Sequence, residues 1–216
     1  MDNAIQTIAI YALPVIFAIT LHEAAHGYVA KHFGDLTAYA QGRVSLNPIR
    51  HIDPIGTILL PLVTLLLGGI LFGWAKPVPV NFSALRRPKQ DMLWVALAGP
   101  GANLFMALLW GLVIRLGLGM SGSELSHPMI LMGEAGIKIN IVLMVLNLLP
   151  LPPLDGGRVA VSLLPPRMAQ SFSRIEPYGF MILLLLLITG VLGAIIGPFI
   201  SMGIRMVAWF FGLGTE

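Results

Sequence analysis

Long apolar runs separated by short polar connections dominate this sequence. Several reach the roughly 20 residues that a helix needs to cross about 30 Å of hydrocarbon. We expect membrane-embedded segments over about 4–33, 53–73, 92–118, 129–149 and 178–211. The last run is too long for one crossing, and "LGAIIGP" near its middle suggests two helices joined by a tight turn. The pattern predicts an all-α polytopic membrane protein with about five to six membrane-embedded segments.

Composition supports this class. Hydrophobic residues make up 56% and charged residues 11% of the 216 residues, and the mean hydropathy is +0.86, whereas soluble domains average roughly 25% charged residues. The first run is not followed by an A-x-A-like cleavage site, so a removable signal peptide is a poor interpretation. We expect a single membrane-embedded domain over 1–216, with a core over about 4–158 and a C-terminal helical hairpin over about 178–214.

The first apolar run ends in "TLHEAAHGYVAKHFGD", which contains a His-Glu-x-x-His pattern. On a helix, His22 and His26 lie one turn apart on one face and can bind the same ion, while Glu23 points about 100° away and can reach a water on its open side. The alternative is two hydrogen-bonded core histidines. Ionisable groups at membrane depth are costly and usually functional, which favours a metal site.

A catalytic zinc site usually has three protein ligands. If the helix continues, His32 lies about 9 Å along the axis from His26, too far to share the ion. The other candidates are Asp35, His51, Asp53, Glu124, Glu134 and Asp155. Asp155 stands out because "NLLPLPPLDGGR" gives it a proline-stiffened approach and two following glycines that permit close packing. An ordinary interfacial turn is the alternative interpretation of this stretch.

"HEAAH" followed far downstream by "NLLPLPPLDGG", with "AGPGANLF" between them, resembles the site-2 protease family of intramembrane zinc metalloproteases. The likeness covers about 4–158. It implies that His22, His26 and Asp155 bind one Zn²⁺ per chain and that Glu23 is the catalytic base. It also implies that Asn147 lies at the active site, where its amide could steady an oxyanion or hold substrate. A helix-to-helix hydrogen bond is the alternative role for Asn147.

If both motifs serve one ion, the helices that carry them must end on the same side of the membrane. If every apolar run crossed the membrane, the two helices would end on opposite sides, so one intervening run must turn back. We expect it to be 53–73, where Pro61 and several glycines suit a re-entrant hairpin. The connections 34–52, 74–91 and 151–177 then share one side.

Together with Lys31, these three connections carry ten of the thirteen basic residues, and 119–128 carries none. The positive-inside rule makes the basic side cytoplasmic. The N-terminus would then lie outside, the active site in the cytoplasmic half, and the C-terminus inside after a final hairpin.

We therefore expect an intramembrane zinc endopeptidase, in a prokaryotic cell (inner) membrane, that cleaves transmembrane segments or remnant signal peptides. The rivals are a metal-binding transporter and a catalytically silent scaffold that binds membrane helices. Its partners would be these substrates and the lipid bilayer, not nucleic acid. "AYAQGRVSL" and "AKPVPVNF" are expected to be extended cytoplasmic-side loops that could pair with unwound substrate, or could be mere connectors. Asn47 and His51 could line the entrance, although an Asn-Pro turn is the simpler account.

Overall fold

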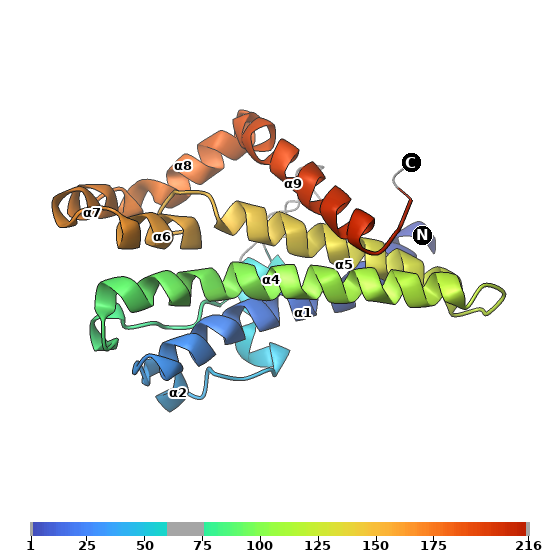
Figure 1. The fold of residues 1–216 in the computed structure, drawn as a ribbon, viewed down its shortest axis with the longest axis horizontal. Coiled ribbons are helices and arrows are strands. Elements are labelled where there is room, and N and C mark those ends of the chain that lie inside the picture. The colour runs from blue at the N-terminus through green and yellow to red at the C-terminus, as the bar shows by residue number, and fades with distance from the viewer. Residues whose placement is uncertain (1, 60–75, 215–216) are drawn as a thin grey trace.

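The structure is a computed structural model that describes residues 2–59 and 76–214. Every regular element in these two ranges is helical, which confirms the all-α expectation (Figure 1). The elements are α1 (Asp2–His32), α2 (Thr37–Ala40), η1 (Pro48–His51), η2 (Pro54–Leu59), η3 (Phe82–Ala84), α4 (Pro88–Gly119), α5 (Ser126–Asn147), α6 (Asp155–Leu163), α7 (Pro166–Ser173), α8 (Glu176–Ile188) and α9 (Val191–Phe210).

Four helices of the described chain, α1, α4, α5 and α9, are long and apolar enough to cross a membrane. The pair α7 and α8, bent by 61° at its break, makes at most a fifth span. The observed α1, α4 and α5 begin and end within a few residues of the predicted runs 4–33, 92–118 and 129–149. The predicted run 53–73 lies largely outside the described residues, so a sixth segment is not tested.

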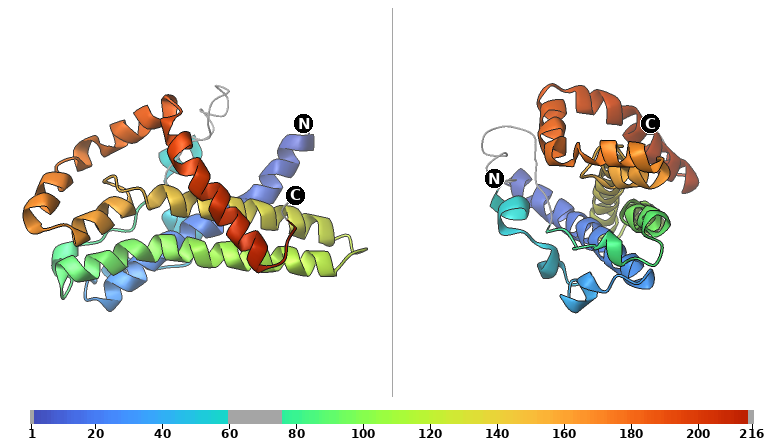
Figure 2. Two further views of the ribbon diagram at one scale, coloured as in Figure 1. Left: turned by 45° about the horizontal axis from the view of Figure 1, so that its top comes forward. Right: turned by 90° about the vertical axis from the view of Figure 1, so that its left-hand side faces the viewer.

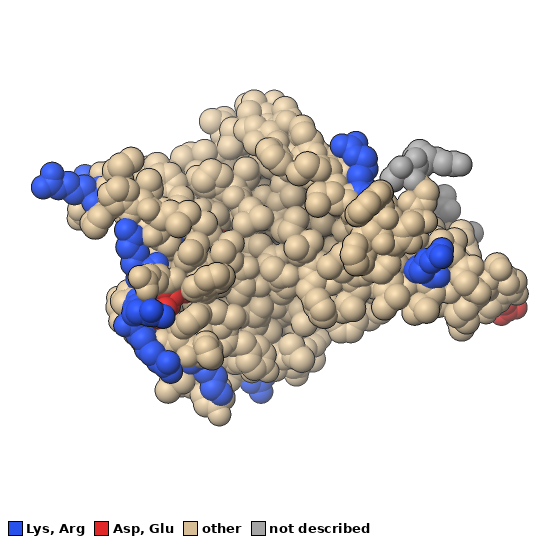
Figure 3. Space-filling view, viewed as in Figure 1, with Lys and Arg blue, Asp and Glu red and all other residues tan. Residues whose placement is uncertain are grey.

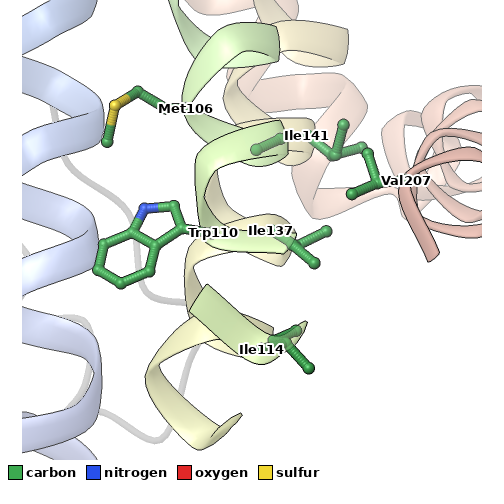
Figure 4. Close-up of a cluster of buried hydrophobic side chains, with 7 residues drawn as sticks. Met106, Trp110, Ile114, Ile137, Ile141 and Val207 are labelled. Atoms are coloured by element: carbon green, nitrogen blue, oxygen red, sulfur yellow. The ribbon is translucent and has the colours of Figure 1, made fainter. Parts of the chain in front are cut away.

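The centre of the molecule is a bundle in which α1, α4 and α5 pack against one another (Figures 1 and 2). One buried apolar cluster joins α4, α5 and α9, and Figure 4 shows its Trp110 side chain pointing toward α1 and its Ile141 facing Val207. A second cluster, built around Ala30, Leu85 and Val95, packs the connection before α4 onto α1. The HEAAH turn of α1 lies between these two apolar layers.

The chain between α1 and α4 leaves and re-enters the bundle at the same end. The Arg86 backbone N–H donates to the Phe33 carbonyl over 3.0 Å, immediately after α1 and before α4. Nearby, the Asp35 carboxylate accepts the Asn81 backbone N–H at 2.7 Å. The expected re-entrant turn itself falls on residues outside the described ranges, but the return of the chain to this end is what such a turn requires.

Some sequence-based expectations need correction. The connection 151–177 was expected to be a polar loop and instead forms α6 and α7, short helices whose apolar residues recur on one face. The first three residues of "AYAQGRVSL" belong to α2 and the rest forms turns and bends, because local hydrogen bonds such as that from the Arg43 N–H to the Ala38 carbonyl satisfy its backbone groups. Residues 76–81 of "AKPVPVNF" form no helix or turn, as the prolines predict, and Asn81 has extended backbone angles; we call 76–81 the extended segment.

The C-terminal run does form two helices, but the turn is at Thr189–Gly190, before "LGAIIGP", which belongs to α9. The end of α9 packs beside Gly111, in the half of α4 away from its start. Figures 1 and 2 show the end of α9 away from the end of the bundle where α4 begins, whereas we expected the C-terminus on the side where α4 begins; its side of the membrane stays a prediction. Only 13 residues of α8 precede the turn, which is too short for a full crossing.

Basic side chains gather at the end of the bundle where α1 finishes and α4 begins (Figure 3). The HEAAH motif occupies the half of α1 nearest this end. Since Lys31 is the first basic residue at that end of α1, His22 lies about 14 Å further into the bundle along the helix axis. We call this the basic end of the bundle.

Candidate metal centre

Helix α4 orients both histidines of the HEAAH motif. His22 and His26 are buried, and each uses its Nδ1 atom for a hydrogen bond to α4. The His26 Nδ1 atom lies 2.7 Å from the Val95 carbonyl oxygen. Because a carbonyl can only accept, the proton of neutral His26 is on Nδ1, and its Nε2 carries a lone pair.

The proton on His22 is fixed by a side-chain amide. Its Nδ1 atom lies 2.6 Å from Oδ1 of Asn103. The amide orientation is set elsewhere, because Asn103 Nδ2 donates to the Ala18 carbonyl at 3.3 Å. Oδ1 of Asn103 therefore accepts from His22, whose Nε2, like that of His26, carries a lone pair.

Asp155 reaches the histidines from the first residue of α6. Its approach is rigid, because Leu149, Leu151 and Leu154 pack on a cluster formed by α8 and α9. The following residues must be glycine: a Cβ on Gly156 would strike the carbonyls of Leu148 and Leu149, and one on Gly157 would strike the backbone of Pro152. The two glycines of "LDGG" thus let α6 start close to the end of α5.

Three ligand atoms converge where these elements meet. Asp155 Oδ2 lies 3.3 Å from His22 Nε2 and 3.4 Å from His26 Nε2, and the two Nε2 atoms are 3.1 Å apart. The Asp155 carboxylate thus presents an acceptor oxygen to the two imidazoles.

This arrangement leaves three acceptors facing one another. Asp155 Oδ2 is buried, and no donor within 2–59 or 76–214 hydrogen-bonds to it. Two imidazole lone pairs and a carboxylate oxygen at such separations need a cation between them, and two histidines with one carboxylate form a common ligand set of catalytic zinc. The residues present therefore fit the zinc ion expected from the sequence.

Gly99 lets α4 approach close enough to form the site. A Cβ at this position would lie 2.6 Å from Nε2 and Cε1 of His22 and would also strike His26 Nε2. Any side chain at this position would thus point at the metal-binding edges of both rings. Only glycine leaves this space open.

Glu23 is anchored from outside the bundle. Its Oε2 atom accepts the backbone N–H of Val78 at 2.7 Å. Val78 is buried and lies in the extended segment 76–81. In the same segment, the Lys76 backbone N–H donates to the His51 carbonyl at 3.0 Å. The carboxylate next to His22 in sequence is therefore joined to the extended segment predicted from "AKPVPVNF".

Other sequence candidates stay outside the cluster. Asn147 ends α5, and its Nδ2 atom donates to the Leu143 carbonyl, so among the described residues no hydrogen bond joins it to the three converging side chains. His32 is exposed and stacks edge-on against Phe33. His51 is buried, with Nε2 on the Ser45 carbonyl, and Asn47 caps η1 through the Ile49 N–H, as an Asn-Pro turn predicts.

Sequence reasoning missed the residues of α4 and α5 that orient the ligands, chiefly Gly99, Asn103 and Asn140. A usable signal existed for the first two. "AGPGANLF" places a glycine and an asparagine four residues apart, on one face of an otherwise apolar helix. A polar residue inside an apolar span needs a partner, and a histidine on a neighbouring span is one of few available.

Comparisons with known proteins agree with this centre. The profile of Peptidase family M50 matches residues 119–190, a range that includes Asp155 but not the HEAAH motif. A protein of Bacillus subtilis provisionally named zinc metalloprotease YwhC is 40% identical over 194 residues, which cover 88% of this chain and 85% of that protein. Mycolicibacterium smegmatis has a relative provisionally named zinc metalloprotease Rip2, 32% identical over 91% of this chain and 70% of the relative.

The Rip2 relative in Mycobacterium tuberculosis is 30% identical over 92% of this chain and 68% of its own length. No solved structure gives a significant match. The curated relatives cover about nine tenths of this chain. With its apolar spans and this likeness, the chain belongs to Peptidase family M50, the site-2 protease family, and is an integral membrane protein.

Proposed function

We propose that this protein is an intramembrane zinc endopeptidase with one Zn²⁺ per chain, held by His22, His26 and Asp155. The observation that carries the proposal is the convergence of three acceptors whose atoms all lie within 4.8 Å of one another, with Glu23 next to the first ligand on α1. A metal held only for structure would be expected to have four protein ligands, whereas three leave a position for water.

Zinc bound in such a site would polarise a substrate carbonyl and make water acidic enough to attack near neutral pH. Glu23 is the proposed general base. It would take a proton from the attacking water and return it to the leaving amine. The Val78 N–H occupies Glu23 Oε2, so Oε1 is the atom proposed to accept the proton. Asn147, at the end of α5, is proposed to hold the substrate carbonyl once substrate is bound.

The position of the site supports cleavage inside the bilayer. On α1, His26 lies about 8 Å and His22 about 14 Å along the axis from Lys31, within the half of a 30 Å hydrocarbon layer next to the basic end. The positive-inside rule places that end in the cytoplasm, with the N-terminus outside. Transmembrane segments and remnant signal peptides, which reach this depth, are the proposed substrates, and a prokaryotic cell membrane is the proposed location.

The extended segment 76–81 is the proposed place for substrate to lie. A helical peptide must unwind before its amides can reach the site, and an extended edge offers partners for the freed backbone groups. The segment lies beside Glu23 through the Val78 hydrogen bond, which favours this role over that of a simple connector.

The main rival is a metal transporter, which would use the same ligands but would need no base. Replacing Glu23 by Gln keeps the size and the acceptor for the Val78 N–H but removes the basic carboxylate. We expect E23Q to bind one zinc per chain like the wild type and to lose at least about 100-fold in cleavage rate, since proton transfer contributes that much. Glu134→Gln, an exposed change on α5, is the matched control and should behave as wild type.

The assay follows cleavage of fluorescently labelled model transmembrane and signal-peptide segments by protein reconstituted in lipid vesicles. Zinc is counted in the same samples by elemental analysis, and zinc entry into the vesicles is followed with a trapped dye. Unchanged cleavage by E23Q would remove Glu23 as the base. Zinc uptake by wild-type vesicles without any peptide cleavage would favour the transporter.

A further inference from the structure

Two asparagines buried in the membrane-spanning bundle form a continuous hydrogen-bonded chain that ends at a metal-binding histidine. Asn103 of α4 and Asn140 of α5 both have 0% of their surface exposed. Asn140 Nδ2 donates to the Gly136 carbonyl at 2.8 Å, and its Oδ1 accepts from Asn103 Nδ2 at 3.0 Å. Asn103 Oδ1 then accepts from His22 Nδ1 at 2.6 Å.

The direction of this chain is fixed at two backbone carbonyls. Gly136 O and Ala18 O can only accept, so the NH₂ group of each asparagine must face its carbonyl. If the Asn103 amide were turned over, its oxygen would face both the Ala18 carbonyl and Asn140 Oδ1. Its NH₂ group would face His22 Nδ1, which would move the imidazole proton to Nε2 and block that atom as a ligand.

The two histidines differ in how they are held. His26 donates to a main-chain carbonyl, that of Val95, whose direction is set by helix α4 itself. His22 depends on a side chain that could present either an oxygen or an NH₂ group. The Asn103 amide must therefore be fixed by its other partners, and these are the Ala18 carbonyl and, at the shorter distance, Asn140 Oδ1.

We propose that Asn103 is the positioning residue that keeps His22 in its metal-binding tautomer, and that Asn140 acts through Asn103 to hold it in that orientation. The inference rests on the proposed zinc site. In this arrangement α5 contributes to the metal centre without touching it, through a relay that runs from α5 to α4 to α1. Loss of either amide frees the His22 ring and lowers zinc affinity.

Three variants of the full-length protein in detergent or lipid test the relay. Asn103→Leu and Asn140→Leu keep approximate volume and remove the amide. Asn103→Asp retains an oxygen that accepts from His22 and, in its protonated form, an O–H that donates to Asn140 or Ala18. We expect about 10- to 100-fold weaker zinc binding for Asn103→Leu, as for other partners of zinc-bound histidines, a smaller loss for Asn140→Leu, and largely restored binding for Asn103→Asp.

Zinc affinity is measured by chelator competition, and the visible spectrum of the Co²⁺-substituted protein reports ligand geometry independently of catalysis. Ile141→Ala is the matched control for lost packing, because Ile141 is fully buried next to Asn140 and belongs to the apolar core rather than the relay. We expect Ile141→Ala to lower the melting temperature while leaving the zinc affinity and Co²⁺ spectrum unchanged.

The relay is refuted if folded Asn103→Leu binds zinc within twofold of wild type with the same Co²⁺ spectrum. It is also refuted if Asn103→Asp loses as much affinity as Asn103→Leu, because the acceptor would then be irrelevant. Failure of the proposed function would look different: E23Q would cleave like wild type, whatever the asparagine variants do to zinc affinity.

Discussion

Gly99→Ala tests the metal centre with the smallest possible change, one methyl group. The added Cβ would lie 2.6 Å from His22 Nε2 and Cε1, whereas real Cβ contacts are essentially never below 3.0 Å. Relief of this overlap requires a movement of at least about 0.4 Å, beyond the roughly 0.2 Å tolerance of metal-ligand distances. Either the imidazoles turn aside or α4 retreats and lengthens the hydrogen bonds that orient them.

Gly101 is the matched control on the same helix. It is exposed, and a Cβ there meets nothing within 4 Å. Both changes improve helix propensity by up to about 1 kcal/mol, so Gly101→Ala should be neutral or slightly stabilising and should keep full zinc binding. We expect Gly99→Ala to weaken zinc binding by on the order of 100-fold, as when the support of a ligating histidine is lost.

The assay is chelator competition for zinc on purified protein, with thermal unfolding recorded on the zinc-free forms. A folded Gly99→Ala variant with the zinc affinity of Gly101→Ala would refute the placement of α4 against the two histidines. Loss of affinity in both variants would show instead that helix flexibility, and not the open space at Gly99, matters for binding.

Two further predictions concern the buried Asp35 and the effect of zinc on stability. Asp35, which is 1% exposed, accepts the backbone N–H groups of Thr37 and Asn81. Asp35→Ala should therefore lower the free energy of unfolding, measured with a chemical denaturant, by about 3 kcal/mol. Asp53→Ala, near η2, is the comparison variant. Asp35→Ala should also speed hydrogen exchange at Asn81, and unchanged exchange there would contradict the anchoring role. Zinc at 100-fold above its Kd should stabilise the folded protein by about 2.7 kcal/mol. Removing this zinc with a chelator should therefore lower the melting temperature. A melting temperature that is indifferent to zinc would argue against a site formed only in the folded bundle.

The spans and the pairing of His22 with His26 could be predicted from sequence because both depend on local signals, whereas the choice of Asp155 rested on the resemblance to the site-2 protease family. Apolar runs of the right length with few charged residues marked α1, α4 and α5. Helical spacing brought His22 and His26 together, and the requirement that Asp155 reach the same ion placed the ends of α1 and α5 on one side. The zinc roles of these residues and the role of Glu23 remain predictions for the experiments above.

Other features depended on contacts that sequence spacing does not reveal. Asn103 and Asn140 are 37 positions apart, and their pairing follows from how α4 and α5 happen to be rotated. The helices α6 and α7 were missed because prolines and arginines made 151–177 resemble a loop, although the segment is amphipathic. The turn was expected within "LGAIIGP" because this stretch contains residues that usually break helices. It lies at Gly190 instead, and α9 accommodates Pro198.

The two prolines around Val78 fix the alignment of the extended segment along α1. Between Pro77 and Pro79 the only backbone N–H is that of Val78, and Glu23 accepts it. If the segment slid by one residue in either direction, a proline without a donor would face the carboxylate, and the buried Val78 side chain would move to the opposite face. A slip of the segment by one residue against the proposed catalytic base is therefore disfavoured. A peptide that pairs along the segment would be aligned relative to Val78 and Glu23. The choice of scissile bond would then depend on this alignment as well as on the fit of the side chains.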